Sequence, residues 1–144
     1  MFGWGSAPYD YQWAYLHPKK AAKMAYKMAG IKEARKEIDV AEVDDRFSYK
    51  ELQHLEALGL ARPGEAGILA EEGALSINGS LPTNTSGGAL GVGNCLEATG
   101  LQKSLEIVTQ LRGHANKRQV SEVEKGLAQA WRFIPSGSGA VAIF

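Results

Sequence analysis

Hydrophobic residues recur at helical spacing in three parts of the chain. In residues 19–29, alanine and methionine alternate with lysine, which predicts an amphipathic helix that begins at Pro18 and ends at Gly30. Residues 47–58 repeat phenylalanine and leucine at similar spacing and predict a second helix. A third helix is predicted over residues 101–111, where leucine and valine recur every three or four positions.

The second and third helices also carry local signals at their ends. Ser48 followed by Glu51 fits a capping box at the start of the second helix, and Gly59 follows its end. Gly113 follows the end of the third helix in the same way. These residues therefore support the helical boundaries that the hydrophobic spacing indicates.

Short apolar runs between the helices predict strands. Residues 38–43 are typical of a buried strand, and residues 126–131 and 140–144 of two strands joined by a tight glycine turn. Weaker patterns indicate an initial strand in residues 1–7 and short strands at 67–70 and 74–77. Because strands and helices alternate, we expect an α/β fold in which helices cover a mixed sheet.

Composition narrows the classes of function. The chain has 144 residues, the size of one domain, and 16 basic residues balance 16 acidic ones. This balance gives no signal for a nucleic acid or membrane partner, and no apolar run approaches the ~20 residues of a membrane span. The N-terminus lacks a secretory pattern, and the single cysteine excludes an internal disulfide and a cysteine-built zinc site. We therefore expect a cytoplasmic protein without a bound metal.

A glycine-rich segment, NTSGGALGVGNCLEATG at 84–100, leads into the third helix. Such a loop can bind an anion or an oxyanion at the helix start, or it can form a tight crossover beside a sheet, and its composition alone leaves both open. No lysine followed by serine or threonine comes directly after its glycines, as a phosphate-binding loop needs, and no third glycine completes a dinucleotide fingerprint after Gly91 and Gly93. The segment is therefore neither of these nucleotide-binding motifs.

The same segment resembles the C-terminal signature of thiolases of the sterol-carrier and archaeal type. NTSGG, GVGNC, EATG and a helix ending in QLRG follow the family's order N-x-S-G-G, G-x-G-H-P, G-A-T-G and Q-L-R-G. Upstream, DDRF is similar to the box that reads H-D-C-F or N-E-A-F in those enzymes. The closing run GLAQAW…SGSGAVAIF is similar to their last two strands. The resemblance covers essentially all of residues 1–144, as one thiolase C-terminal-like domain.

The resemblance implies one half of a five-layered αβαβα sandwich and acyltransferase chemistry on coenzyme A thioesters, with no covalently bound cofactor. The family's nucleophilic cysteine lies in the N-terminal half, so we expect activity only with such a half, and none from the chain alone. The expected partner is such a half or further copies in a homo-oligomer. We also expect the isolated chain to expose an apolar patch where the halves would meet. An aldolase-type subunit with a zinc-ribbon and OB-fold partner, and a scaffold without chemistry, are the alternatives.

The motifs that carry the chemistry are altered. Asn94 replaces the family's oxyanion-binding histidine, and an amide can donate a hydrogen bond but cannot act as a base. Asp44 and Arg46 replace the histidine and cysteine of the upstream box, so Arg46 either pairs internally or binds an anionic thioester. Asp44 and Asp45 could equally be plain charges at the start of the second helix. Gly137 in the last motif could present its N–H group to an oxyanion.

Other positions have a structural and a functional interpretation. Gly88, Gly91 and Gly93 are expected to let the backbone approach the substrate thioester. Cys95, at the family's proline position, is either a small filler or a thiol activated at a helix N-terminus. All three histidines lie outside the aligned motifs, and His54 is expected to be a packed or surface residue. The tryptophans are expected in the core.

Overall fold

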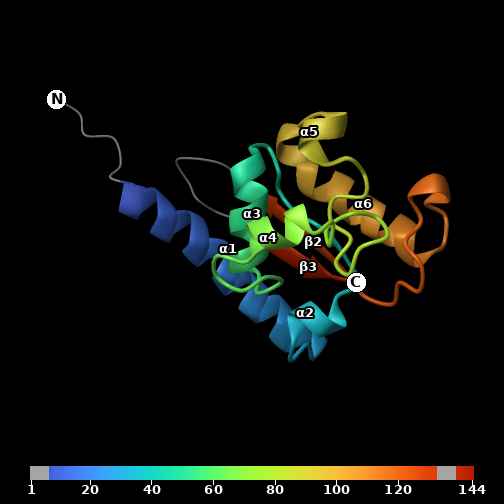
Figure 1. Ribbon diagram of the computed structural model, residues 1–144, viewed down its shortest axis with the longest axis horizontal. Helices are drawn as coiled ribbons and strands as arrows, with labels where there is room; N and C mark the ends of the chain where they lie inside the picture. The colour runs from blue at the N-terminus through green and yellow to red at the C-terminus, as the bar shows by residue number, and fades with distance from the viewer. Residues whose placement is uncertain (1–6, 133–138) are drawn as a thin grey trace.

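The computed structural model describes residues 7–132 and 139–144, with side chains from residue 16 onward (Figure 1). Its elements, in chain order, are α1 (Ala7–Ala29), α2 (Ala34–Glu37), β1 (Val40–Glu42), α3 (Ser48–Ala57), α4 (Ala66–Glu71), α5 (Gly88–Val92), the 3₁₀ turn η1 (Leu96–Ala98), α6 (Thr99–Leu111), the 3₁₀ turn η2 (Asn116–Arg118), β2 (Gly126–Trp131) and β3 (Gly139–Ile143). None of the described helices is long and apolar enough to cross a membrane.

The three described strands form one mixed sheet in the order β1-β2-β3. β1 runs parallel to β2 with Val40 beside Gly126, and β2 runs antiparallel to β3. A parallel bridge between Ala41 and Thr83 brings the start of the glycine-rich segment beside β1. The sheet confirms the predicted α/β class, and the predicted strands at 38–43, 126–131 and 140–144 are confirmed within a few residues.

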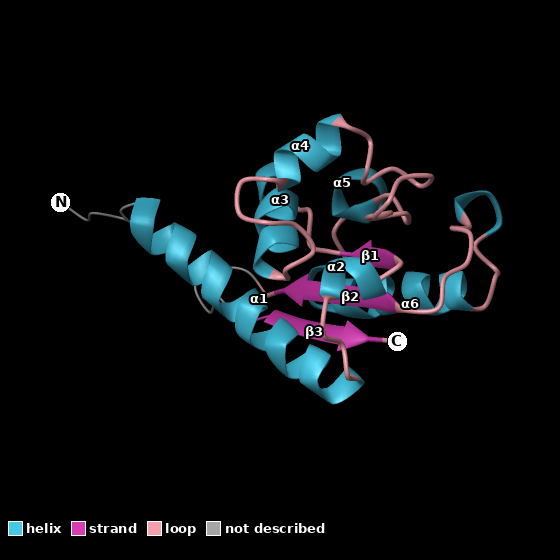
Figure 2. Ribbon diagram, turned by 60° about the horizontal axis from the view of Figure 1, so that its bottom comes forward, coloured by secondary structure: helices cyan, strands magenta, loops and turns pink. Residues whose placement is uncertain are grey.

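Two hydrophobic clusters cover the two faces of the sheet (Figure 2). On one face α6 packs against β1 and β2, where Ile107 meets Val40 and Ala128. On the other face α1 and α3 enclose a larger cluster that includes Leu55 and Leu127. Leu127 and Ala128 are consecutive in β2 and point to opposite faces, as the pleat of a strand requires. The buried apolar runs of the sequence are therefore explained by a sheet with helices on both sides.

Helix α1 is longer than predicted. It begins at Ala7 and not at Pro18, which lies buried inside the helix. A proline removes only one N–H group from the helix, and α1 packs against β3 and α3. Gly30, with φ of 74°, ends α1 as predicted. The initial strand expected at residues 1–7 falls outside the described residues except for Ala7, which is helical.

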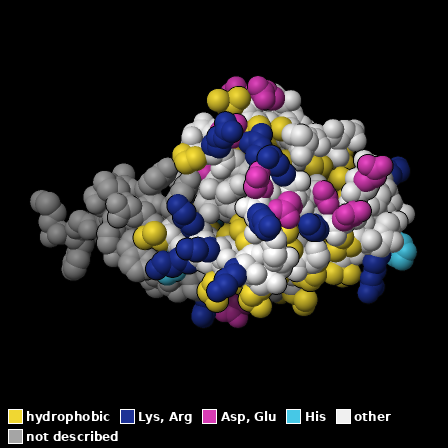
Figure 3. Space-filling model, turned by 90° about the horizontal axis from the view of Figure 1, so that it is seen from below, with side chains coloured by type: hydrophobic (Ala, Val, Ile, Leu, Met, Phe, Trp, Pro, Cys, Tyr) yellow, Lys and Arg dark blue, Asp and Glu magenta, His cyan; other side chains and the backbone are white. Residues whose placement is uncertain are grey.

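The outer surface of α1 carries lysines, as its amphipathic pattern predicts, but also Met24 and Met28, which are 67% and 86% exposed although the pattern places methionine on the inner face. The exposed residues of this surface include Lys19, Lys20, Lys23 and Lys27. Figure 3 shows that basic, acidic and hydrophobic side chains all occur on the face of the molecule seen from below. This face therefore does not carry charge of a single sign.

Three local predictions around α3 and α4 are wrong. Ser48 is the first helical residue of α3 and makes no capping hydrogen bond, while the Glu51 carboxylate accepts one from Asn84 Nδ2 at 2.8 Å. The strand expected at 67–70 is helix α4, because Ala66 and Leu69 are buried three residues apart, a spacing that a helix aligns on one face. The strand expected at 74–77 is a series of turns.

Helix α6 is amphipathic in an unusual sense. Its inward face carries Ile107 together with Lys103, Glu106 and Gln110, all of which are buried. Its outward face carries leucines, of which Leu101 is 75% exposed and Leu105 is 63% exposed. The expected exposed apolar patch is therefore present on α6.

Candidate functional site

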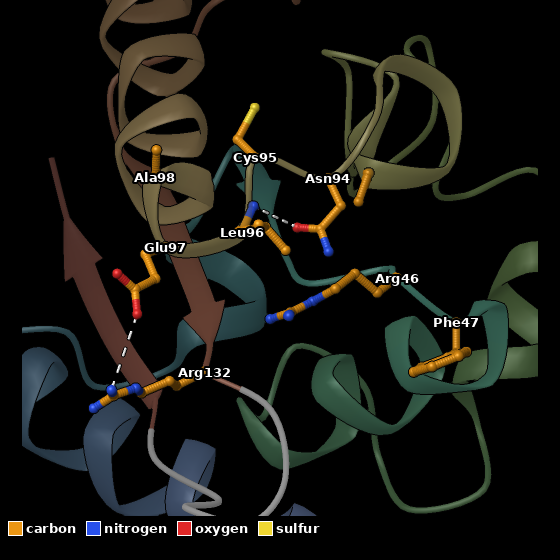
Figure 4. A pocket seen from close by; sticks show the side chains of 9 residues that line it. Arg46, Phe47, Asn94, Cys95, Leu96, Glu97, Ala98 and Arg132 are labelled. Carbon is orange, nitrogen blue, oxygen red and sulfur yellow. Dashed lines mark hydrogen bonds and ion pairs between the residues drawn. The ribbon is translucent and has the colours of Figure 1, made fainter.

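A pocket of about 900 Å³ opens where the start of α3, the loop after α5 and the end of β2 meet (Figure 4). The described residues that line it are Arg46, Phe47, Ala89, Asn94, Cys95, Leu96, Glu97, Ala98 and Arg132. The fold thus brings together Arg46 and Asn94, which lie 48 positions apart in the chain. Both were predicted site residues from two separate motifs.

Asn94 is held with its amide in one orientation. Its Oδ1 atom accepts hydrogen bonds from the Leu96 N–H group at 2.9 Å and from the Thr99 hydroxyl at 3.0 Å. Because a backbone N–H must meet the oxygen, the remaining atom of the amide is the Nδ2 donor. Nδ2 has no hydrogen-bond partner among the described residues, and in Figure 4 it points toward Arg46. The site can therefore offer a hydrogen bond to a ligand at this position.

Arg46 pairs internally, one of the two expected possibilities. Its Nε and Nη2 atoms donate to the buried Asp44 carboxylate at 3.0 and 2.8 Å, and Nη2 also donates to the Trp131 carbonyl oxygen. The guanidinium lies 5.8 Å from the centre of the Trp131 ring. Asp44 therefore neutralises Arg46 and fixes it between α3 and the end of β2.

Asp44 itself is held from two sides by residues that the sequence motifs did not single out. The Asp44 N–H group donates to Gln129 Oε1 at 2.7 Å, and His54 Nδ1 lies 2.9 Å from the Asp44 carbonyl oxygen. His54 is fully buried, which confirms the prediction of a packed residue, and burial lowers its pKa from the usual value. No motif marks these residues, because they act on the backbone of Asp44.

The predicted glycines take different positions. Gly88 is buried, and a Cβ atom there would overlap the Asp45 carboxylate, so its closest neighbour is Asp45. A Cβ atom at Gly91 or Gly93 would have no other atom within 4 Å, and none of the three is among the described residues that line the pocket. Gly137 lies outside the described residues. Substrate binding by Gly88, Gly91 and Gly93 and an oxyanion contact by Gly137 stay predictions.

Cys95 lines the pocket but is poorly placed for a nucleophile. Its side chain is exposed, and Figure 4 shows the thiol directed away from Asn94 and Arg46. No described histidine lines the pocket beside it. The geometry favours the interpretation of Cys95 as a filler at the family's proline position.

Glu97 and Arg132 complete the pocket wall and were not predicted. Their charged groups are 4.0 Å apart with side chains 88% and 71% exposed, so the pair contributes little to stability. Each described arginine of the pocket thus faces a carboxylate. The described wall has no unbalanced positive charge, and its remaining surface is largely apolar.

Trp131, the last residue of β2, contacts the pocket residue Arg46. It is buried, as expected for a core tryptophan, and its ring makes an edge contact with His54 at 5.9 Å and lies 4.8 Å from Lys50 Nζ. Trp4 and the Trp13 side chain fall outside the described residues. Trp131 therefore supports the pocket wall from the core side.

Comparisons with known proteins identify the family. Residues 9–143 match the family described as Thiolase C-terminal domain-like. An acetyl-CoA acetyltransferase of Methanothermobacter thermautotrophicus is 43% identical over 107 residues, 74% of this chain and 27% of that protein. Sterol carrier protein 2 of Homo sapiens is 42% identical over 102 residues, 71% of this chain and 18% of that protein. The solved structure of an Ltp2-ChsH2(DUF35) aldolase aligns with a TM-score of 0.74 and 29% identity, over 86% of this chain and 30% of that one.

The chain spans less than a third of the length of each of these proteins. The two sequence relatives are of the archaeal and sterol-carrier types, and the matched region includes the glycine-rich segment and the closing strands. The resemblance inferred from the motifs is confirmed. The chain belongs to the thiolase C-terminal domain-like family.

Proposed function

We propose that this chain is the C-terminal half of a thiolase-type enzyme that forms or cleaves a carbon–carbon bond next to the carbonyl of a coenzyme A thioester. An N-terminal half, on a separate chain or on a further part of this one, supplies the nucleophilic cysteine. The chain alone has no thiolase activity. Two observations support this proposal. The chain belongs to a family of thiolase C-terminal domains, and it spans less than a third of the length of its relatives.

The exposed face of α6 carries the proposal. Leu96, Leu101 and Leu105 are 72%, 75% and 63% exposed, while the opposite face of the helix buries charged and amide side chains. A helix at the surface of a complete protein has the reverse arrangement. The leucines therefore need a partner surface that buries them, and an N-terminal half is the proposed partner.

In the assembled pocket, Asn94 acts as a hydrogen-bond donor to the thioester carbonyl oxygen. Its Oδ1 is already used by Leu96 and Thr99, so Nδ2 is presented in a fixed direction. A preorganised donor of this kind stabilises negative charge that develops on oxygen in the transition state. Arg46, neutralised by Asp44, forms the wall opposite and orders that side of the pocket.

An aldolase-type reaction is the second candidate. The aligned structure is described as an Ltp2-ChsH2(DUF35) aldolase, and this chain has a non-titrating Asn94 in place of the thiolase histidine. In this version the chain would cleave a β-hydroxyacyl thioester beside a partner of the DUF35 kind. Like the Claisen-type reaction, this cleavage needs a proton acceptor, and among the described pocket residues Glu97 and Cys95 are the titratable groups that could accept a proton.

The test is to co-express the chain with the part of the Methanothermobacter acetyltransferase that it does not cover, and to purify by a tag on one half. The complex is assayed for thiolysis of acetoacetyl-CoA and for retro-aldol cleavage of a 3-hydroxyacyl-CoA. A matched control carries Leu101→Gln and Leu105→Gln, which should prevent complex formation. Cys95→Ser should keep any activity.

A stable complex that catalyses neither reaction would favour the scaffold alternative. Thiolysis by the purified chain alone, abolished in Cys95→Ser, would overturn the proposal and make Cys95 the nucleophile. If the two leucine substitutions do not affect complex formation, the N-terminal half does not bind the leucine face of α6.

A further inference from the structure

The glycine-rich segment packs against a group of buried charged side chains. We call Glu42, Asp45 and Lys103 the ionic cluster; their side chains are at most 4% exposed. Glu42 ends β1, Asp45 precedes α3, and Lys103 comes from the inward face of α6. Burying charges is costly unless they are paired and hydrogen-bonded, so their partners show what the cluster holds in place.

Asp45 binds the backbone of α5. Its Oδ1 atom accepts the Ala89 N–H at 2.7 Å, and Oδ2 lies 3.4 Å from the Leu90 nitrogen. Ala89 is one of the residues that line the pocket. Asp45 thus satisfies N–H groups at the start of a short helix and fixes one wall of the site.

Glu42 binds the turn that precedes α5. Its Oε1 atom accepts the Ser86 N–H at 2.9 Å, and Oε2 accepts the Ser86 hydroxyl at 2.7 Å. The Ser86 hydroxyl oxygen also accepts the Gly88 N–H at 3.1 Å. The two carboxylates therefore bind successive parts of the same loop from the protein interior.

Lys103 is the shared counter-ion. Its Nζ atom lies 3.6 Å from Asp45 Oδ1 and 3.9 Å from Glu42 Oε2. It also donates to the Val43 carbonyl oxygen at 2.6 Å, which ties α6 to the end of β1. Removal of either carboxylate would leave Lys103 with one fewer buried anion, so the three charges act as a unit.

We propose that Asp45 and Glu42, with Lys103 as counter-ion, are the positioning residues that hold segment 84–93 and so place Asn94 at the pocket. The glycines serve this arrangement and do not themselves contact the ligand. In this view Gly88 is required because its missing side chain makes room for the Asp45 carboxylate, which a Cβ atom would overlap, and its φ of 61° also disfavours a side chain, so Asp45→Asn and Ser86→Ala separate the two causes. Gly91, in the same helix, has open space and needs no such room.

The difference between the two glycines gives a matched test. Gly88→Ala, Asp45→Asn and Ser86→Ala are compared with the control Gly91→Ala in the full chain. The first readout is amide hydrogen exchange at Ala89 and Leu90. The second is the rate at which Cys95, the only cysteine and the residue next to Asn94, reacts with an aromatic disulfide. Thermal unfolding is recorded for each variant.

The amide that Asp45→Asn introduces can still accept the Ala89 N–H but carries no charge, and the Cβ atom of Gly88→Ala displaces the carboxylate, so exchange at Ala89 should become roughly 10- to 100-fold faster in both variants. Ser86→Ala keeps all three charges of the ionic cluster. It should make amide exchange at positions 86 and 88 faster while the core stays folded. The Cys95 reaction should change in the same variants, and Gly91→Ala should leave both readouts within about twofold of the wild type.

The proposal is wrong if exchange at Ala89 and the Cys95 reaction are unchanged in Asp45→Asn and Gly88→Ala, or if Gly91→Ala changes them equally. If Asp45→Asn fails to fold, Ser86→Ala and Gly88→Ala still test the proposal. These readouts need no catalysis. A further arm rests on the proposed function: in an active complex, Ser86→Ala should lower kcat more than it raises KM. If only this kinetic prediction fails, the result counts against the proposed enzymatic function and leaves the positioning role of the ionic cluster unaffected.

Discussion

His54 Nδ1 lies 2.9 Å from the backbone oxygen of Asp44, and its Nε2 atom is buried without a partner among the described residues. The neutral ring therefore donates from Nδ1, and a second proton on Nε2 would be a buried charge with no acceptor. Burial lowers the pKa of His54 in the folded chain. The buried imidazole therefore supports the Asp44 backbone in its neutral form, through the Nδ1–H group.

The free energy of unfolding should fall below pH 6.5 because of His54. The unfolded chain binds a proton on His54 below the usual pKa of about 6.5, and the folded chain does not until its lower pKa is reached. Stability is lost across this window by up to about 1.4 kcal/mol per pH unit. His54→Asn, which can still donate to the Asp44 oxygen, should remove this part of the slope in urea unfolding curves. An unchanged slope would show that His54 becomes protonated in the folded state.

Glu51 should show the opposite pH dependence. Burial is the main cause that raises its pKa, while the hydrogen bond from Asn84 acts in the other direction. The folded chain then binds a proton more readily than the unfolded chain, so this contribution is full below about pH 4.5 and is lost as pH rises through the raised pKa.

Glu51→Gln keeps an oxygen that can accept from Asn84 Nδ2. Its stability relative to the wild type should therefore rise with pH from about 4.5 toward neutrality. Glu71→Gln, at an exposed position of α4, serves as the control. A stability difference that does not vary with pH would mean that Glu51 is solvated like an ordinary surface carboxylate.

The main elements of the fold were predictable because their signals are local. The glycines at positions 30, 59 and 113 all have positive φ and end helices where the sequence indicates. The start of α1 was not predictable, because a proline inside a helix and a proline at its first turn look alike in a sequence. Residues 66–71 were misjudged, because short apolar runs fit a strand or a helix until tertiary packing decides.

The site was predictable only in part. The aligned motifs indicated Arg46 and Asn94, and the fold places both at the pocket. Motif spacing could not reveal Lys103, because an amphipathic pattern assigns lysine to the solvent side of a helix, and here the leucines take that side. The resemblance to half of a larger protein was the signal for this inversion. It implies that the sheet of this chain covers one face of α6 and the other half of the protein covers the leucine face.

The leucine face of α6 should make the isolated chain self-associate. Leu101→Gln with Leu105→Gln should shift sedimentation toward the monomer across a wide concentration range. Both side chains are exposed, so the free energy of unfolding should change by no more than about 0.5 kcal/mol each. Ile107→Ala, on the buried face of the same helix, should instead cost roughly 2–5 kcal/mol. A wild-type chain that stays monomeric throughout would contradict this prediction.

Asn94 offers the most direct test of the proposed chemistry, because its two amide atoms have separate tasks. Oδ1 holds the loop through Leu96 and Thr99, and Nδ2 is the proposed donor to the substrate oxygen. Asn94→Asp keeps the acceptor and removes the donor, whereas Asn94→Ala removes both. In an active complex both variants should lose roughly 100- to 1,000-fold in kcat, the usual effect of deleting one oxyanion donor.

Stability separates the two tasks. Asn94→Asp should melt close to the wild type, since the loop hydrogen bonds remain, and Asn94→Ala should be destabilised by about 1 kcal/mol. Asn94→His should be tolerated, because the family carries an imidazole at this position, and should restore some thiolysis. Full turnover in Asn94→Asp would exclude the donor role, since that variant has no N–H group left to offer. Asn94 would then be a residue that shapes the loop, and the scaffold alternative would gain support.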